Sequence, residues 1–228
     1  MTELKMTARV TGFLYLALAV AGGLGFLLVR PALYVAEMPA ETARNLVSRA
    51  AMARFGVVLE LLTVATQALT AVWFFKLFRG VNVVAAMAIA AFGLMNAVAI
   101  LGSAACLSTA LVVVGDATLA PGGDVGATVQ LFYVVSERLW SVGALFFGLW
   151  LVPMGHIART SRHLPKALGW TLLVGGVGYT LSALVANGVP DAPRWLADAL
   201  TIPATVGELW MIGFLLIVGL RPLESRPS

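Results

Sequence analysis

The sequence is poor in charge and almost free of the residues that build common soluble active sites. Only 11% of its 228 residues are charged, and it has one cysteine, Cys106, and two histidines. A single cysteine excludes an internal disulfide and a zinc site built from cysteines. The chain also lacks a phosphate-binding loop, an HExxH motif and a nucleophile elbow. Nucleotide-binding, metalloprotease and hydrolase sites of the familiar motif-bearing kinds are therefore excluded.

Apolar residues are what the sequence has in excess. They make up 60% of the chain, and the mean hydropathy is +0.94. A helix needs about 20 apolar residues to cross roughly 30 Å of hydrocarbon. We predict an all-α integral membrane protein, one domain over residues 1–228, with six transmembrane helices in a bundle at residues 11–29, 55–75, 83–103, 130–151, 167–185 and 199–220. The third helix either breaks near Ser103 or extends towards Val114.

The basic residues lie mainly at the ends of apolar segments, so the net charge of +4 indicates membrane topology rather than nucleic-acid binding. We predict that both termini are cytoplasmic, although the first outer loop alone holds four of the five outer basic residues. Short amphipathic helices are expected in the outer loops, at residues 39–54 and 192–197. The first span also resembles a signal peptide with a cleavage-like triplet at residues 19–21, but its apolar run continues to Val29, which favours a retained helix. The expected cytoplasmic basic residues are Lys5, Arg9, Lys76, Arg79, Arg159, Arg162, Lys166, Arg221 and Arg226, and the outer ones are Arg30, Arg44, Arg49, Arg54 and Arg194.

Two stretches resemble a known family. They are FFGLWLVPMGHIARTSRHLPKALGWTLLVGGVGYTLSAL at residues 146–184 and ARVTGFLYLALAVAGG near the start. Both resemble the bacterial multi-pass membrane family called domain of unknown function 4386. The resemblance implies a place in the bacterial cytoplasmic (inner) membrane and brings no established activity. Family members often carry a histidine and an acidic residue just before the Phe-Gly-Leu-Trp block, whereas this chain has Glu137 and Arg138 there. A family role that needs an imidazole is therefore not expected here.

Three glutamates fall inside predicted spans: Glu60, Glu137 and Glu208. Each lies about five to nine residues from the outer end of its span, or roughly 8 to 14 Å deep at 1.5 Å per residue. A charged group in lipid costs about 2.5 to 3.5 kcal/mol, so polar faces of these helices must meet protein or water. We predict that they converge on one interior site. Helical spacing adds further polar residues to these faces: Thr63, Gln67, Thr70, Asn96, Ser103, Gln130, Tyr133, Ser141, Tyr179, Ser182, Thr201 and Thr205.

Glu137 and Arg138 are adjacent but point about 100° apart on a helix. Arg138 is therefore expected to pair with a carboxylate on another helix, either Glu208 or Glu60. Three carboxylates and one guanidinium would leave a buried charge of −2, which is unfavourable. Either a glutamate holds a proton, which makes an acid, or a hard cation such as Mg²⁺ occupies the cluster. We assign no residue as a metal ligand, and the cofactor is unknown.

Three kinds of function fit these residues. The first is an enzyme that uses buried glutamates as general acid and base on a hydrophobic substrate, an isoprenoid being one candidate, in chemistry like that of terpene cyclases. The second is a proton- or cation-coupled carrier or sensor, and the third is a structural or accessory membrane protein. The expected partners are the lipid bilayer and a small hydrophobic molecule, without nucleic acid, and a homo-oligomer stays open. The candidate catalytic residues are Glu60, Glu137, Arg138 and Glu208, with Glu60 or Glu208 as proton donor, and the candidate substrate-binding residues are Tyr133, Trp140, Tyr179, Gln67 and Asn96.

Overall fold

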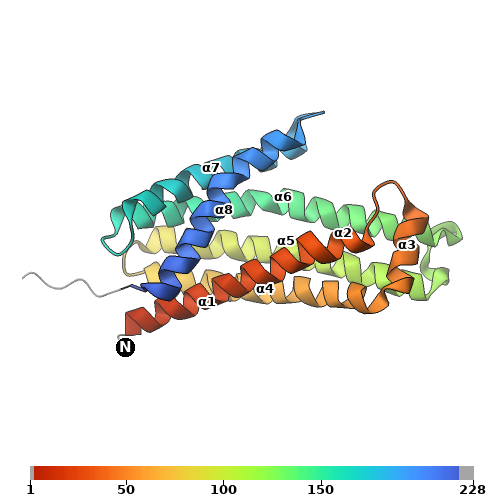
Figure 1. The fold of residues 1–228 in the computed structure, drawn as a ribbon, viewed down its shortest axis with the longest axis horizontal. Coiled ribbons are helices and arrows are strands. Elements are labelled where there is room, and N and C mark those ends of the chain that lie inside the picture. Colours follow the sequence, from red (N-terminus) through yellow and green to blue (C-terminus); the bar gives the residue numbers. More distant parts are fainter. Residues whose placement is uncertain (1–2, 221–228) are drawn as a thin grey trace, which may run out of the picture. The chain divides into compact units, whose positions relative to one another are not determined.

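Helices are the only regular elements in the described part of the computed structural model, which covers residues 3–220 without the side chain of Arg194 (Figure 1). Six helices are long and apolar enough to cross a membrane: Glu3–Leu33, Ala50–Phe78, Val83–Gly115, Val125–Thr160, Lys166–Gly188 and Trp195–Ile217. The predicted all-α class with six candidate spans is confirmed. The sidedness of the termini stays a prediction, and Arg221 and Arg226 lie outside the described residues.

The first span is built from three consecutive elements, α1 (Glu3–Gly23), the π-helical segment η1 (Leu24–Val29) and α2 (Arg30–Leu33). The remaining elements are α3 (Pro39–Ser48), α4 (Ala50–Phe78), α5 (Val83–Gly115), two short 3₁₀ turns η2 (Ala117–Leu119) and η3 (Pro121–Gly123), α6 (Val125–Thr160), α7 (Lys166–Gly188) and α8 (Arg194–Ile217). Of the two alternatives for the third span, the extended helix is confirmed, because α5 runs unbroken to Gly115.

Two expected loop helices differ from the structure. The helix predicted over residues 39–54 is interrupted at Arg49, whose φ of −120° and ψ of 38° are not helical, so α3 and α4 are separate. The short helix predicted at residues 192–197 does not exist as a separate element. Its residues from Arg194 onward form the first turn of α8, because Pro193 lies just before that turn, where a missing backbone N–H disrupts no helical hydrogen bond.

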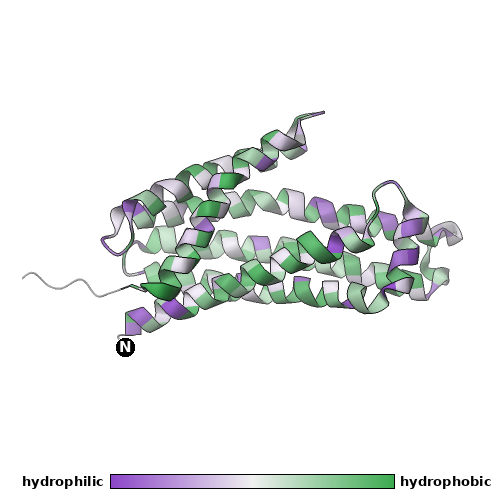
Figure 2. Ribbon diagram, in the orientation of Figure 1, coloured by the Kyte–Doolittle hydropathy of each residue, from purple (hydrophilic) through white to green (hydrophobic). Residues whose placement is uncertain are grey.

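Side-chain caps fix where two long helices begin. The Asn82 side chain accepts a hydrogen bond from the Ala85 backbone N–H over 3.0 Å at the start of α5. The Asp124 carboxylate does the same for the Ala127 N–H over 2.9 Å at the start of α6. Such caps satisfy backbone donors that have no partner within the helix. Hydrophilic residues gather at helix ends and turns, while the lengths of the helices are mainly hydrophobic (Figure 2).

The chain divides into two compact units. Unit 1 comprises Met1–Leu16, Thr66–Asn96 and Ser141–Ser228, and unit 2 comprises Ala17–Ala65 and Ala97–Trp140. The helices α1, α4, α5 and α6 contribute residues to both units. The prediction of one domain stays a prediction.

Close contacts between helices of unit 1 explain why glycine is needed at several positions of the family-like stretch at residues 146–184. A Cβ on Gly155 of α6 would lie 2.8 Å from the Gly169 carbonyl oxygen of α7, and a Cβ on Gly175 would lie 2.5 Å from the Ala204 Cα of α8. Only glycine allows backbones to approach this closely, as in other membrane helix pairs. The resulting antiparallel pair of α7 and α8 is visible in Figure 1.

The core of unit 2 packs the end of the first span against α4, α5 and α6. Two hydrogen bonds anchor α3 to that end: Asn45 donates to the Leu33 carbonyl over 3.1 Å, and Arg49 donates to the Ala32 carbonyl over 2.7 Å. The short α2 is therefore held firmly in place. The buried residues of this core are Val29, Leu33, Leu46, Ala53, Leu59, Leu107, Ala110, Val113, Ala120, Val129 and Tyr133.

Candidate functional sites

A buried ion pair between Arg30 and Glu60 is the centre of unit 2. Arg30 Nη2 lies 2.8 Å from Glu60 Oε1, and the two side chains are only 10% and 7% exposed. The same nitrogen donates to Ser136 Oγ over 2.7 Å and to Ser103 Oγ over 3.3 Å. One guanidinium therefore connects residues from the first, second, third and fourth spans.

The carboxylate of Glu60 is equally well supplied with donors. Ser103 Oγ donates to Glu60 Oε2 over 2.7 Å, and the Trp140 indole N–H donates to Oε1 over 3.3 Å. Ser103 and Ser136 are also 2.7 Å apart. With Arg30, three donors surround Glu60, which stabilises its ionised form. Arg30 and Glu60 thus compensate each other's charge within one closed network.

The π-helical segment η1 helps to bring Arg30 to this position. A π-helical turn contains one more residue than an α-helical turn, so every later residue is displaced around the helix axis. Arg30 follows directly after Val29, the last residue of η1, and its backbone N–H donates to the Gly25 carbonyl. A cavity of about 20 Å³, room for roughly one water molecule, adjoins Arg30, Glu60 and Tyr133.

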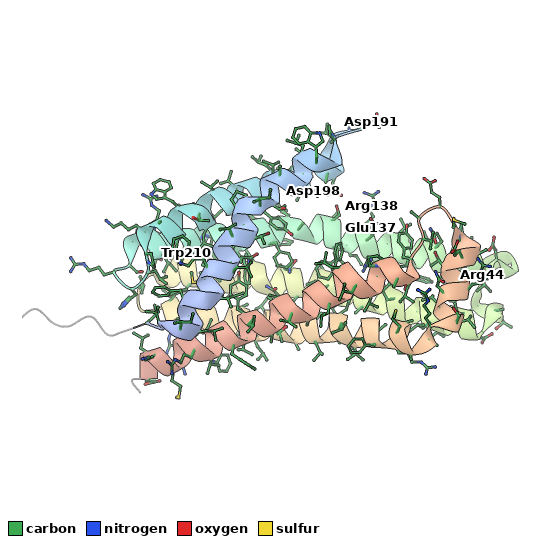
Figure 3. The ribbon with its side chains drawn as sticks, in the orientation of Figure 1. Arg44, Glu137, Arg138, Asp191, Asp198 and Trp210 are labelled. Carbon is green, nitrogen blue, oxygen red and sulfur yellow. The ribbon has the colours of Figure 1, made fainter. Side chains whose placement is uncertain are left out.

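Arg30 was expected in the first outer loop, and that prediction is wrong. It was placed there because the apolar run ends at Val29, but Arg30 continues the first helix and points into the protein. The prediction that Arg138 would pair with Glu60 is also wrong, since Arg30 is the partner. Among the described residues neither Glu137 nor Arg138 forms an ion pair, and both are exposed side chains that project from α6 (Figure 3).

Glu137 therefore does not share the buried site of Glu60. The buried face of α6 in unit 2 passes through Val129, Tyr133 and Ser136, one position back from Glu137. Burial raises the pKa of the Tyr34 hydroxyl, which lies beyond the first span, and the negative charge of Glu137 acts in the same direction. The predicted substrate-binding residues of unit 2 lie near Glu60, because Trp140 donates to Glu60 and Tyr133 lines the same small cavity as Glu60.

Unit 1 holds the third glutamate, Glu208, in a different setting. The half-buried carboxyl group of Glu208 on α8 accepts a hydrogen bond from the Tyr15 hydroxyl of α1, and Tyr15 is only 2% exposed. Among the described residues no arginine or lysine forms an ion pair with Glu208. Unlike Glu60, Glu208 is therefore a carboxyl group without a compensating cation in its own unit.

Aromatic rings surround this carboxyl group. The ring of Tyr15 meets Phe74 edge-on at 5.5 Å and Trp150 at 5.4 Å. Phe147 contacts Trp150 at 6.2 Å and stacks on Tyr179 at 5.9 Å. The predicted residue Tyr179 thus belongs to this aromatic cluster, which we define as Tyr15, Phe74, Phe147, Trp150 and Tyr179. Its faces can stabilise positive charge on a molecule held there.

The two predicted amide residues also lie in unit 1. Gln67 is fully buried and Asn96 is 2% exposed. Neither amide nitrogen has a hydrogen-bond partner within residues 3–220, and the same is true of the Gln67 oxygen and the buried Trp150 indole nitrogen. The Trp150 ring lies against Tyr15, the hydrogen-bond donor of Glu208. A carboxyl group and several polar atoms without partners therefore accumulate in one unit.

A metal centre finds no matching ligands in the described part of the chain. No group of three or more histidine, cysteine, aspartate or glutamate side chains there is placed to hold a metal ion. His156 is an exposed residue of α6, and Cys106 is a half-buried free thiol.

Sequence reasoning missed four residues of these sites: Arg30, Ser136, Tyr15 and Trp150 as a neighbour of Glu208. Ser136 could have been predicted, because it lies three residues after Tyr133. Spacings of three and four residues both return to the same helical face, so Ser136 fits the face of Tyr133 as well as Glu137 does. Tyr15 lies in an apolar run where a single hydroxyl gives no pattern. Its role becomes visible only when α1 and α8 are seen together.

Six apolar helices with buried polar networks define a polytopic helical membrane protein. The chain belongs to the family described as Domain of unknown function (DUF4386), which it matches over residues 10–219. No curated protein and no solved structure matches it.

Proposed function

We propose that this membrane protein is an enzyme in which Glu208 acts as general acid and base on a small hydrophobic substrate. The single observation that carries the proposal is the Tyr15–Glu208 hydrogen bond within the aromatic cluster. A carboxyl group in apolar surroundings, without a cation beside it, keeps its proton and can donate it. An isoprenoid is one candidate substrate, and the bacterial cytoplasmic membrane is the expected location.

Glu60 is the weaker candidate for the proton donor. Its carboxylate is paired with Arg30 and accepts two further hydrogen bonds, so three donors already engage its oxygens. The Tyr15 hydroxyl donates to one oxygen of Glu208, so the second oxygen can carry the proton.

The proposed chemistry is a simple proton transfer. The O–H bond of the Glu208 carboxyl group breaks while a new bond to hydrogen forms on the substrate. The resulting positive charge is stabilised by the faces of the aromatic cluster, and the Tyr15 hydroxyl stabilises the carboxylate that remains.

Deuterium transfer tests this proposal without knowledge of the substrate. Membranes containing the full-length protein are incubated with a bacterial lipid extract in D₂O, and high-resolution mass spectrometry identifies lipids that gain deuterium at carbon. The substitution E208Q should lower the rate by about 100-fold or more, which is the usual contribution of a general acid. E137Q, the matched change at the exposed glutamate of α6, should leave it unchanged. Equal labelling by E208Q and wild type would contradict the proposal.

A further inference from the structure

Three side chains in the interior of unit 1 lack the hydrogen bonds that buried polar groups normally make. They are Gln67, Asn96 and Trp150, which are 0%, 2% and 0% exposed. The atoms without partners in the described protein are both polar atoms of the Gln67 amide, the Asn96 nitrogen and the Trp150 indole nitrogen. A buried polar group that stays unpaired destabilises the folded protein. Lipid tails cannot supply the missing hydrogen bonds.

The three side chains come from three helices and approach one region. A Cβ on Gly93 of α5 would lie 3.3 Å from Gln67 Nε2 and 3.2 Å from the Trp150 ring. Gln67 on α4 and Trp150 on α6 therefore flank the same point. Asn96 lies three residues after Gly93, so it occupies the same face of α5 one turn further on.

The chemistry and the narrow space of this region select the ligand. Three nitrogen donors and one oxygen acceptor need a molecule that both accepts and donates hydrogen bonds. The Cβ position at Gly93 is also only 2.8 Å from the Ala71 Cβ, so little room is left for a larger molecule. No carboxylate belongs to the set, which disfavours a bare cation. We infer that Gln67, Asn96 and Trp150 bind water inside unit 1, and that this water returns the proton to Glu208.

Trp150 also lies beside the acid, since its ring meets that of Tyr15 at 5.4 Å and the Tyr15 hydroxyl donates to Glu208. After Glu208 has given its proton away, its carboxylate takes one from a hydronium ion in this water. An O–H bond forms at the carboxyl group, an O–H bond of the hydronium ion breaks, and a water molecule remains. The proton-return step rests on the proposed function of Glu208, whereas the water site does not.

Hydroxyl-radical footprinting of the full-length protein in lipid nanodiscs tests the inference. X-rays generate radicals from bound water, which label the side chains beside it. Trp150 should be labelled although it is fully buried, while Phe78, also fully buried in unit 1, should not. The substitutions Q67L and N96L should lower Trp150 labelling severalfold. Q130L, the same change at a partly buried glutamine of unit 2, should not alter it.

Two results would overturn the water site: wild-type Trp150 labelled no more than Phe78, or Trp150 labelling that Q67L and N96L leave unchanged. The wild-type comparison remains decisive even if a variant fails to fold. Footprinting needs no catalysis, so the two proposals fail separately. Strong Trp150 labelling together with normal deuterium transfer by E208Q would support the water site and contradict the role of Glu208 as the acid. Unlabelled Trp150 together with an inactive E208Q variant would contradict the water site and support the role of Glu208.

Discussion

Breaking the ion pair between Arg30 and Glu60 should destabilise the protein strongly, and removing both charges should cost no more than removing one. In R30M the Glu60 carboxylate, 7% exposed, keeps only the donors Ser103 and Trp140. In E60Q the Arg30 charge stays buried with neutral acceptors alone, namely the two serine hydroxyls and the new amide oxygen. Leaving one buried charge without its partner costs about 3 to 5 kcal/mol.

The double variant R30M/E60Q contains no unpaired charge, so its loss should be close to that of one single variant. The expected coupling energy is about 3 kcal/mol, which is the lower end of the loss expected for one single variant and the upper end of the range for residues in direct contact. The free energy of unfolding is measured by titration with SDS in mixed micelles, followed by circular dichroism. The matched controls are E137Q and R138M, a charged pair of the same unit that is exposed, and each should cost less than about 1 kcal/mol.

Two results would refute this reasoning about the ion pair. One is a loss in R30M and E60Q no larger than in the exposed controls. The other is a double variant whose loss equals the sum of the two single losses, because independent effects add and a buried ion pair cannot be independent.

The remaining predictions concern packing and a loop. G175A should lower the free energy of unfolding by about 1 to 3 kcal/mol, because its Cβ would lie 2.5 Å from Ala204. The Cβ of G213A on α8 would meet no atom within 4 Å, so this variant should raise the free energy of unfolding by up to about 1 kcal/mol. Equal effects of the two variants in the SDS titration would contradict this prediction. Hydrogen bonds from the Thr118 hydroxyl and backbone N–H lower the pKa of Asp116, so their stabilisation is present above the ordinary carboxyl pKa and is lost as pH falls through the lowered one. T118V should raise that pKa in an NMR titration of the Asp116 carboxyl carbon, and an unchanged midpoint would show that the hydroxyl has no such effect.

The long helices could be predicted from the sequence because each apolar run is long enough to cross a bilayer on its own. The limit of each span was harder to predict. The hydropathy pattern predicted that the first span ends at Val29, because the charged guanidinium of Arg30 is unfavourable in hydrocarbon unless it has a partner. The partner, Glu60, lies 30 residues away on another helix. The π-helical turn that displaces Arg30 has no recognisable sequence pattern.

The face of a helix was predictable only where several polar residues shared it. On α4 the predicted series Glu60, Thr63, Gln67 and Thr70 is entirely buried. On α6 the helical spacing from Tyr133 fitted both Ser136 and Glu137, which point to neighbouring faces of the helix. The charge of Glu137 favoured the face that proves to be exposed. Burial of Ser136 shows that an uncharged hydroxyl next to an exposed glutamate can be the residue that packs inside.

Infrared spectroscopy of Glu208 tests the central claim most directly. A carboxyl group that carries a proton absorbs at the frequency of a C=O double bond, and the group is identified by substitution. We predict that the full-length protein in lipid shows this band at neutral pH, that E208Q removes it, and that Y15F shifts it to higher frequency because the Tyr15 hydrogen bond is lost. A spectrum without the band, or a band that survives in E208Q, would contradict the account.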